Sequence, residues 1–155
     1  MIVFLDSGVL GLASSPKKSD DACACEQWLF QLIVRNAYII TSDICGYEVR
    51  RGLVLASLQG RKTEGIDNLD QLQEIIDFIP VTTKAMRLAA HLWASSRSQG
   101  QPTADSKTLD ADVIIASQCQ LIQQEYPGQT LIIATTNVKN LSRFVTAQEW
   151  QDISF

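Results

Sequence analysis

Polar side chains follow two strongly apolar segments of the sequence, at the point where each segment ends. Asp6 comes directly after the apolar run 1–5, and Asn137 follows closely on the apolar run 130–135. In open parallel sheets, ligands bind just beyond the carboxyl ends of the strands. If both runs are neighbouring strands of such a sheet, Asp6 and Asn137 are candidates for one binding site.

Three further acids lie among apolar neighbours. Asp110 and Asp112 stand at the start of a predicted helix, and Glu48 lies inside another. An acid in such surroundings is costly to bury unless a positive charge is close. Carboxylates that converge at one sheet edge would repel each other, and a divalent cation would remove that repulsion. Hard oxygen ligands of this kind are those that Mg²⁺ or Mn²⁺ favours.

Each of these residues also has a structural explanation. Asp6 and Asn137 could be turn residues, and Asp110 could cap a helix. Glu48 could form an ion pair with Arg51, or with Arg50, on a helix surface. The residues taken singly leave both explanations open, and only the convergence of several acids favours a cation site.

The alternation of apolar runs and amphipathic segments predicts the elements that would position these side chains. Strands are predicted at 1–5, 37–41, 78–81 and 130–135, with a possible last strand near 152–155. Five helices are predicted, over about 20–35, 43–60, 64–76, 83–98 and 110–124. The first is expected to begin at Asp20 or Asp21 and the second at Ser42 or Asp43, ending at the break at 60–62. The fourth is expected to begin at Thr82 or Thr83, and the fifth at Leu109 or Asp110. The segments 14–19 and 99–108 are predicted loops, the second of them mobile.

This order predicts one domain over residues 1–155, an α/β fold built as a three-layer α/β/α sandwich with a mostly parallel central sheet. The chain has 155 residues, of which 46% are hydrophobic and 19% charged, which is typical of a packed globular core. We find no internal repeat and no linker.

Composition also limits the function classes. The net charge of -4 argues against broad non-specific attraction to nucleic acid, although a local site would not be affected. No apolar run approaches the ~18 residues of a membrane-spanning helix. No basic leader precedes the first apolar run, so we expect a cytoplasmic protein.

The four cysteines lack the usual zinc spacing and are expected to be reduced thiols or core residues. His91 lies in an apolar helical stretch and is expected to have a structural role.

Four segments carry a family resemblance. They are the apolar run that ends in Asp6, GYEVRRGL at 46–53, LDADVIIA at 109–116, and ATTNVKN at 134–140. In this order, over essentially the full chain, they resemble the PIN domain, and within it the VapC-type toxins of bacterial toxin–antitoxin pairs. The resemblance implies a PIN-like fold and an Mg²⁺- or Mn²⁺-dependent endoribonuclease. It also implies a homodimer and a cognate antitoxin partner.

The resemblance assigns site residues one by one. Asp6 matches the first acid of the family, Glu48 the second and Asp112 the third, so these three would be both catalytic residues and metal ligands. Asp110 would assist as a nearby acid, and Asn137 falls on the fourth position. Many relatives have Asp-Phe where this chain has Asn140 and Leu141, which leaves open whether Asn137 or Asn140 fills that position.

Hydroxyl groups and basic side chains complete the prediction. Ser7, Thr135 and Thr136 could support the acids through their hydroxyls. RNA phosphates would require positive contacts, and the basic residues nearest to Glu48 in sequence are Arg50, Arg51, Arg61 and Lys62. Lys107 is a further candidate. A solvated helix face is the structural alternative for this basic group.

Two other functions compete with the nuclease. A PIN-like domain without activity could serve as a binding or scaffold module, and the altered ligands near Asn137 and Asn140 keep this alternative open. A phosphatase-like domain could use Asp6 as a nucleophile, but Gly8 stands where a dehalogenase-type phosphatase has a second Asp. Metal-dependent cleavage of RNA would distinguish the leading hypothesis from both.

Overall fold

A parallel sheet forms the centre of the molecule. The computed structural model describes residues 1–61, 64–102 and 110–154, and within these ranges five strands form one sheet. The strands are β1 (Ile2–Leu5), β2 (Tyr38–Ser42), β3 (Asp77–Ile79), β4 (Leu131–Thr135) and β5 (Ala147–Glu149). Their spatial order is β3-β2-β1-β4-β5, and every neighbouring pair is parallel. The predicted mostly parallel sheet is therefore confirmed.

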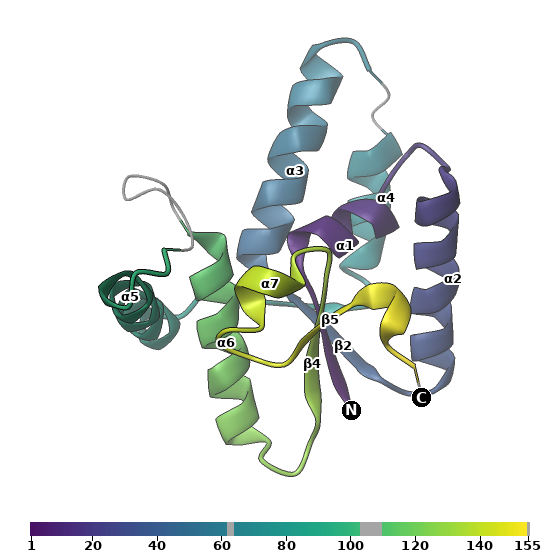
Figure 1. Ribbon diagram of the computed structural model, residues 1–155. Coiled ribbons are helices and arrows are strands. Elements are labelled where there is room, and N and C mark those ends of the chain that lie inside the picture. Colours follow the sequence, from purple (N-terminus) through teal and green to yellow (C-terminus); the bar gives the residue numbers. More distant parts are fainter. Residues whose placement is uncertain (62–63, 103–109, 155) are drawn as a thin grey trace.

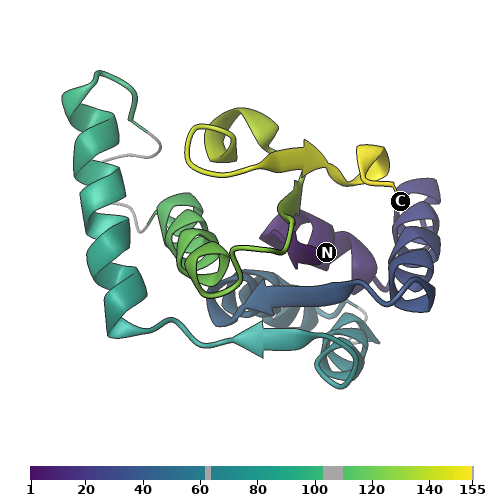
Figure 2. The same cartoon turned by 90° about the horizontal axis from the view of Figure 1, so that it is seen from below.

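Helices cover both faces of this sheet. They are α1 (Ser7–Ala13), α2 (Asp20–Val34), α3 (Asp43–Leu58), α4 (Glu64–Leu72), α5 (Thr83–Ser98), α6 (Ala111–Glu125) and α7 (Val138–Leu141), followed by the 3-10 turn η1 (Trp150–Asp152). Figures 1 and 2 show α1, α2 and α4 on one side of the sheet and α6 on the other, with α5 packed outside α6. This arrangement confirms the predicted α/β/α sandwich.

The strands form where the sequence is apolar on both faces. All four residues of β1 are buried, and so are four of the five residues of β4. A parallel sheet with helices on both sides requires such continuous apolar strands, because neither strand face meets water. Phe4, Leu5 and Ile133 are among the largest side chains that are completely buried.

Short polar side chains begin most of the longer helices. The side chains of Ser42 and Thr82 accept backbone N–H groups at the starts of α3 and α5, as predicted. At α2 the prediction was wrong by one residue, because Ser19 is the cap and Asp20 lies in the first turn. An acid in the first turn still interacts favourably with the positive end of the helix.

Two short helices and the last strand differ from the prediction. Turns were expected around Asp6 and Asn137 and no helix was predicted over 7–13 or 138–141, but these two segments form α1 and α7. Helices this short have little stability of their own, and α1 gains its stability from burial of Val9 and Leu10. The last strand is β5, which precedes the segment 152–155 where a strand was expected. Most of the predicted loop 99–108 and Leu109 lie outside the described residues.

The segment 150–153, after β5, packs against α2. The ring of Trp28 lies 5.6 Å from that of Trp150, centroid to centroid, and the Trp28 indole N–H donates to the Ile153 carbonyl at 3.1 Å. These contacts hold the segment after β5 against α2. Cys25, Cys45 and Cys119 are buried, as expected for core residues. Among the described residues, no helix combines the length and apolar character needed to cross a membrane.

The strand order selects one edge of the sheet for a binding site. The chain winds outward from β1 through β2 and β3 on one side, and through β4 and β5 on the other. The crevice between β1 and β4, beyond their carboxyl ends, is the position where open α/β sheets bind ligands. Figure 1 shows α3 rising beyond this edge and α7 lying beside it.

Candidate functional site

Asp6 lies at the carboxyl end of β1 and is buried. Its backbone N–H donates to the Ala134 carbonyl at 3.0 Å, which ties it to β4. Its carboxylate accepts a hydrogen bond from the hydroxyl of Thr135, the last residue of β4. The two neighbouring central strands therefore fix the position of this acid, as the topology predicts.

Burial raises the pKa of Asp6 above its usual value. The Thr135 hydroxyl and the backbone amides of Gly8 and Ser7 oppose this rise, and the nearby Glu48 carboxylate adds to it. The environment thus stabilises the charge on Asp6 only in part. A cation at this edge would supply the remaining stabilisation.

Glu48 is brought to the same edge by α3. The Ser7 hydroxyl donates to Glu48 Oε2 at 2.6 Å, which links the starts of α1 and α3. Arg51 lies one turn further along α3, with its Nη2 3.6 Å from Glu48 Oε1. The structural explanation for Glu48, an ion pair with Arg51, is therefore correct. It coexists with the contact to Ser7, because the two carboxylate oxygens face different partners.

Asp112 lies in the first turn of α6, and its carboxylate interacts electrostatically with the other acids. Its pKa is raised to about 6, first by burial and next by the charge of Asp6. Asp110 and Glu48 raise it further, while a hydrogen bond from Asn140 lowers it. The four predicted acids consequently share one electrostatic environment, although they come from three separate parts of the sequence.

Both candidates for the fourth position contact Asp112 through nitrogen. Asn137 Nδ2 lies 3.4 Å and Asn140 Nδ2 lies 3.3 Å from Asp112 Oδ2. Asn137 precedes α7, and its backbone N–H donates to the Thr135 hydroxyl at 2.8 Å. The two amides therefore act as donors that orient Asp112.

Asp110 has the structural role that its position suggested. It is the N-cap of α6, it is buried, and its carboxylate accepts the Val113 N–H at 3.4 Å. A part in cation binding remains a prediction for this residue.

The donor set fits a hard, hydrated cation. Carboxylate and amide oxygens are the ligand types that Mg²⁺ and Mn²⁺ use, and Mg²⁺ usually retains several waters. Within the described ranges, no ion pair involves Asp6 or Asp112, and no three His, Cys, Asp or Glu side chains are close enough to form a ready-made metal cluster. The acids interact through their charges but do not form a closed cage, so bound water would have to complete the coordination of a cation.

The predicted RNA-binding residues that the structure describes have different surroundings. Arg50 is paired with Asp70 of α4, and Arg51 with Glu48. Arg61 lies beyond Leu58, the last residue of α3. Leu58 is ten positions after Glu48, which corresponds to a rise of about 15 Å along the helix. Lys62 and Lys107 lie outside the described residues. Among the basic side chains of this group that the structure describes, Arg51 is the one beside an acid of the site.

Two of the hydroxyl predictions correspond to observed contacts, and one residue was missed. The Ser7 hydroxyl donates to Glu48, and the Thr135 hydroxyl donates to Asp6. Thr136 is exposed and lies beside Gly8.

Arg143 was not predicted to belong to the site, yet its guanidinium donates to Asn140 Oδ1 at 3.1 Å. Its spacing of three residues from Asn140 is the one signal in the sequence that points to this contact.

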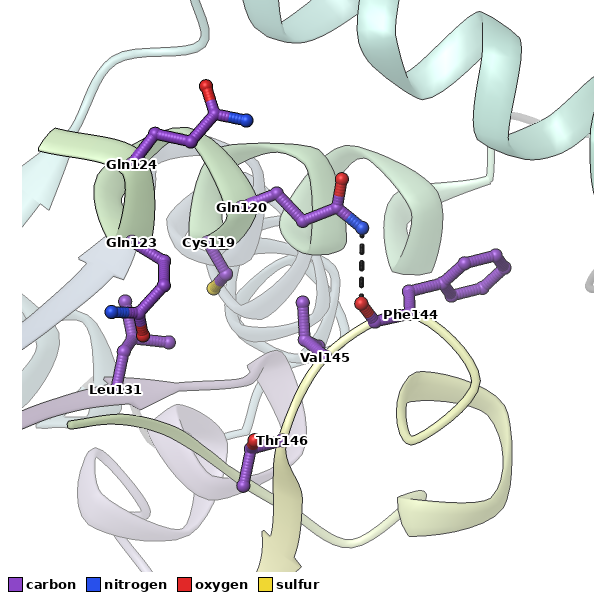
Figure 3. Close-up of a pocket in the computed structure, with 8 residues that line it drawn as sticks. All are labelled: Cys119, Gln120, Gln123, Gln124, Leu131, Phe144, Val145 and Thr146. Carbon is purple, nitrogen blue, oxygen red and sulfur yellow. Dashed lines mark hydrogen bonds between the residues drawn. The ribbon is translucent and has the colours of Figure 1, made fainter. Parts of the chain in front are cut away.

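The acid site is distinct from a hollow of about 400 Å³ between α6 and the segment before β5. Figure 3 shows its lining, in which Gln120 Nε2 donates to the Phe144 carbonyl at 3.1 Å. Cys119 lies at this hollow, and none of the predicted site residues lines it. We therefore place the candidate site at the carboxyl edge of the sheet.

Replacing Thr135 with valine tests the support of Asp6. Valine has nearly the same shape but leaves the buried carboxylate of Asp6 without its side-chain donor, so we expect the free energy of unfolding at pH 7 to fall by about 1.5–3 kcal/mol. Urea unfolding followed by circular dichroism measures this change. The exposed Thr130 offers a matched control, since Thr130→Val should change stability by less than about 0.5 kcal/mol. Equal losses in both variants would contradict a special role of Thr135.

Comparison with known proteins supports the expected fold. The sequence matches no family model and no curated protein sequence. Solved structures do match. A chain of VapBC2 from Rickettsia felis, solved bound to a DNA fragment from the promoter, is 20% identical with a TM-score of 0.68, and the match covers 96% of this chain and 98% of that one.

Two further structures give the same result. A chain of VapBC-1 from nontypeable Haemophilus influenzae is 16% identical with a TM-score of 0.67, covering 98% of this chain and 100% of that one. A chain of a toxin–antitoxin complex from Klebsiella pneumoniae is 16% identical with a TM-score of 0.60, covering 97% and 99%. The α/β/α sandwich with a parallel sheet that the sequence predicts is thus shared with these structures over nearly the whole chain.

Proposed function

We propose that this chain is an Mg²⁺- or Mn²⁺-dependent endoribonuclease that acts as the toxin of a toxin–antitoxin pair. The observation that carries this proposal is the environment of Asp112. Its pKa is raised to about 6, and the causes include the charges of Asp6, Asp110 and Glu48. Several carboxylates that repel each other at the ligand-binding edge of a parallel sheet are suited to hold a divalent cation.

The chain's own groups would divide the work as follows. Asp6, Glu48 and Asp112 would hold the cation, with Asp110 beside them. A cation bound there would supply Lewis acidity towards a phosphate oxygen and would lower the pKa of a bound water. The Thr135 and Ser7 hydroxyls keep Asp6 and Glu48 in place, and the two asparagine amides orient Asp112.

The choice of RNA as substrate and of an antitoxin as partner rests on the family likeness. The three similar structures are VapBC or toxin–antitoxin complexes, which supports an antitoxin partner. Arg51, next to Glu48, is the described basic residue best placed to contact an RNA phosphate, and Arg61 would contact a more distant part of the strand. A homodimer remains part of the same proposal.

One observation favours a second candidate, an inactive PIN-like binding module. The position after β4 contributes two amides and no carboxylate, since Asn137 and Asn140 both donate to Asp112. A site with fewer acids binds a cation more weakly. The binding module therefore becomes the better description if the protein neither binds Mn²⁺ nor cuts RNA.

Removal and return of metal test the proposal. We expect the purified protein to cut a pool of single-stranded RNA oligonucleotides with Mn²⁺ or Mg²⁺, to lose this activity in EDTA, and to regain it when excess Mn²⁺ is added. Product bands on a denaturing gel measure the cleavage, and isothermal titration calorimetry measures Mn²⁺ binding. Cleavage that persists unchanged in EDTA would contradict a metal-dependent mechanism, and absence of both cleavage and Mn²⁺ binding would favour the binding module.

A further inference from the structure

A chain of hydrogen bonds leads from Asp112 to a guanidinium group outside the acid site. Asn140 Nδ2 lies 3.3 Å from Asp112 Oδ2, and Arg143 Nη2 donates to Asn140 Oδ1 at 3.1 Å. The other terminal nitrogen of Arg143 donates to the Gln101 carbonyl at 2.8 Å. Arg143 is therefore held at both ends of its guanidinium.

The chemistry of the three groups fixes the orientation of the Asn140 amide. A guanidinium carries donors and no acceptor, so the oxygen of the amide must face Arg143. An ionised carboxylate accepts and does not donate, so the NH₂ group must face Asp112. Reversing the amide would place donor against donor on one side and acceptor against acceptor on the other.

This orientation decides which oxygens at the site are open to a cation. Asp112 Oδ2 receives the amides of Asn137 and Asn140, and among the described residues none donates to Oδ1, which can therefore take a ligand. The oxygen of Asn140 is occupied by Arg143 and is turned away from Asp112. Asn140 accordingly does not fill the fourth ligand position, and its role is towards Asp112.

We propose that Arg143 and Asn140 form a positioning pair that orients Asp112 for cation binding and acts as one unit. The proposal rests on the proposed cation site. A hydrogen bond polarised by a full charge at its far end is stronger than a bond between neutral groups. Through the neutral amide, Arg143 strengthens the hold on Asp112 Oδ2 without making an ion pair that would compete with the cation for Asp112.

A double-mutant cycle on Mn²⁺ affinity tests the pair. Groups that orient metal ligands typically change metal affinity 10- to 100-fold when removed, so we expect Asn140→Ala to weaken Mn²⁺ binding by about 10-fold. Arg143→Gln should weaken it by at least about 3-fold on the same grounds. Because Arg143 acts through Asn140, the double variant should bind Mn²⁺ no more weakly than Asn140→Ala alone. Titration calorimetry on protein whose fold is verified by near-ultraviolet circular dichroism gives these affinities.

Two further variants make the outcome specific. Lys139→Gln removes a positive charge from the exposed surface of α7, and it should leave Mn²⁺ affinity within about 2-fold of wild type if Arg143 does not act merely by its net charge. Arg143→Lys keeps a charged donor and should recover part of the affinity lost in Arg143→Gln, which also covers the case that glutamine disturbs folding.

The results separate this inference from the proposed function. If wild type binds Mn²⁺ and cuts RNA but the two single losses add in the double variant, the positioning pair is wrong and the nuclease stands. An Arg143→Gln variant with wild-type affinity overturns the pair in the same way. If wild type binds no Mn²⁺ at all, both the pair and the metal-dependent nuclease fall.

Discussion

Replacing Asp6 with asparagine is expected to lower the rate of Mn²⁺-dependent RNA cleavage by about 100- to 1,000-fold, an effect of the size seen when one group that stabilises a transition state is lost. Asp6 is buried at the end of β1, where the two central strands hold it in one position. Asparagine can still accept the Thr135 hydroxyl, so the fold should persist. It lacks the negative charge, however, and a neutral amide cannot offset the charge of a divalent cation.

The matched control is Asp20→Asn, which removes an exposed acid from the first turn of α2 and should leave cleavage unchanged. Initial rates on one labelled RNA, with folding verified by circular dichroism, give the comparison. If the proposed toxin role is correct, induced expression of wild type and of Asp20→Asn should arrest growth, whereas Asp6→Asn should not. Cleavage by Asp6→Asn at the wild-type rate would show that the acids at the sheet edge are not the active site.

The metal-free protein is expected to become less stable as the pH rises from about 4 to 7. The pKa of Asp112 is about 6 in the folded protein, against a usual value of 3.8. Between these two values the folded state binds the proton more tightly than the unfolded state, so the free energy of unfolding decreases with increasing pH. Because the Asp112 side chain is partly exposed, solvent screening reduces this effect, and we expect a loss on the order of 1–2 kcal/mol at pH 7. Burial raises the pKa of Asp6 as well, which acts in the same direction.

The Asp112→Asn variant isolates this effect. It removes the repelling charge and keeps an oxygen that can accept the amides of Asn137 and Asn140, so we expect it to be more stable than wild type at pH 7.5 and to lose most of the decrease between pH 4 and 7. Urea unfolding in EDTA across this range measures both. Added Mn²⁺ should stabilise wild type at pH 7.5 and have little effect on the variant. If the free energy of unfolding changes equally between pH 5 and pH 7.5 in metal-free wild type and in Asp112→Asn, the pKa of Asp112 is not raised by its surroundings.

The main parts of this site were predictable because the responsible signals are local. The apolar runs that end near Asp6 and Asn137 mark strand ends, and parallel strands bring their carboxyl ends to one edge. The choice of Asp112 and Glu48 followed from the family likeness. The structure brings both acids into the electrostatic environment of Asp6. The cap of α3 at Ser42 was likewise a local signal.

The remaining parts depend on contacts that a single sequence does not reveal. The segment 7–13 contains two glycines and has weak helical preference, and it becomes α1 because the neighbouring helices bury its apolar side chains. The fourth ligand position could not be settled from residue types alone, since an asparagine can turn either its oxygen or its nitrogen towards a neighbour. Arg143 decides that question, and its contact with Asn140 was visible only once α7 had formed.

The order of the strands also determines when during protein synthesis the site can exist. The central strand β1 is made first, but its neighbour β4, with the asparagines that follow it, comes from the last quarter of the chain. A nascent polypeptide that has passed the ribosome only as far as α5 contains Asp6 and Glu48 but lacks Asp112 and the strand that holds Asp6 from the other side. If the acids form a nuclease, a nascent molecule cannot cut RNA until α6, β4 and α7 have also left the ribosome.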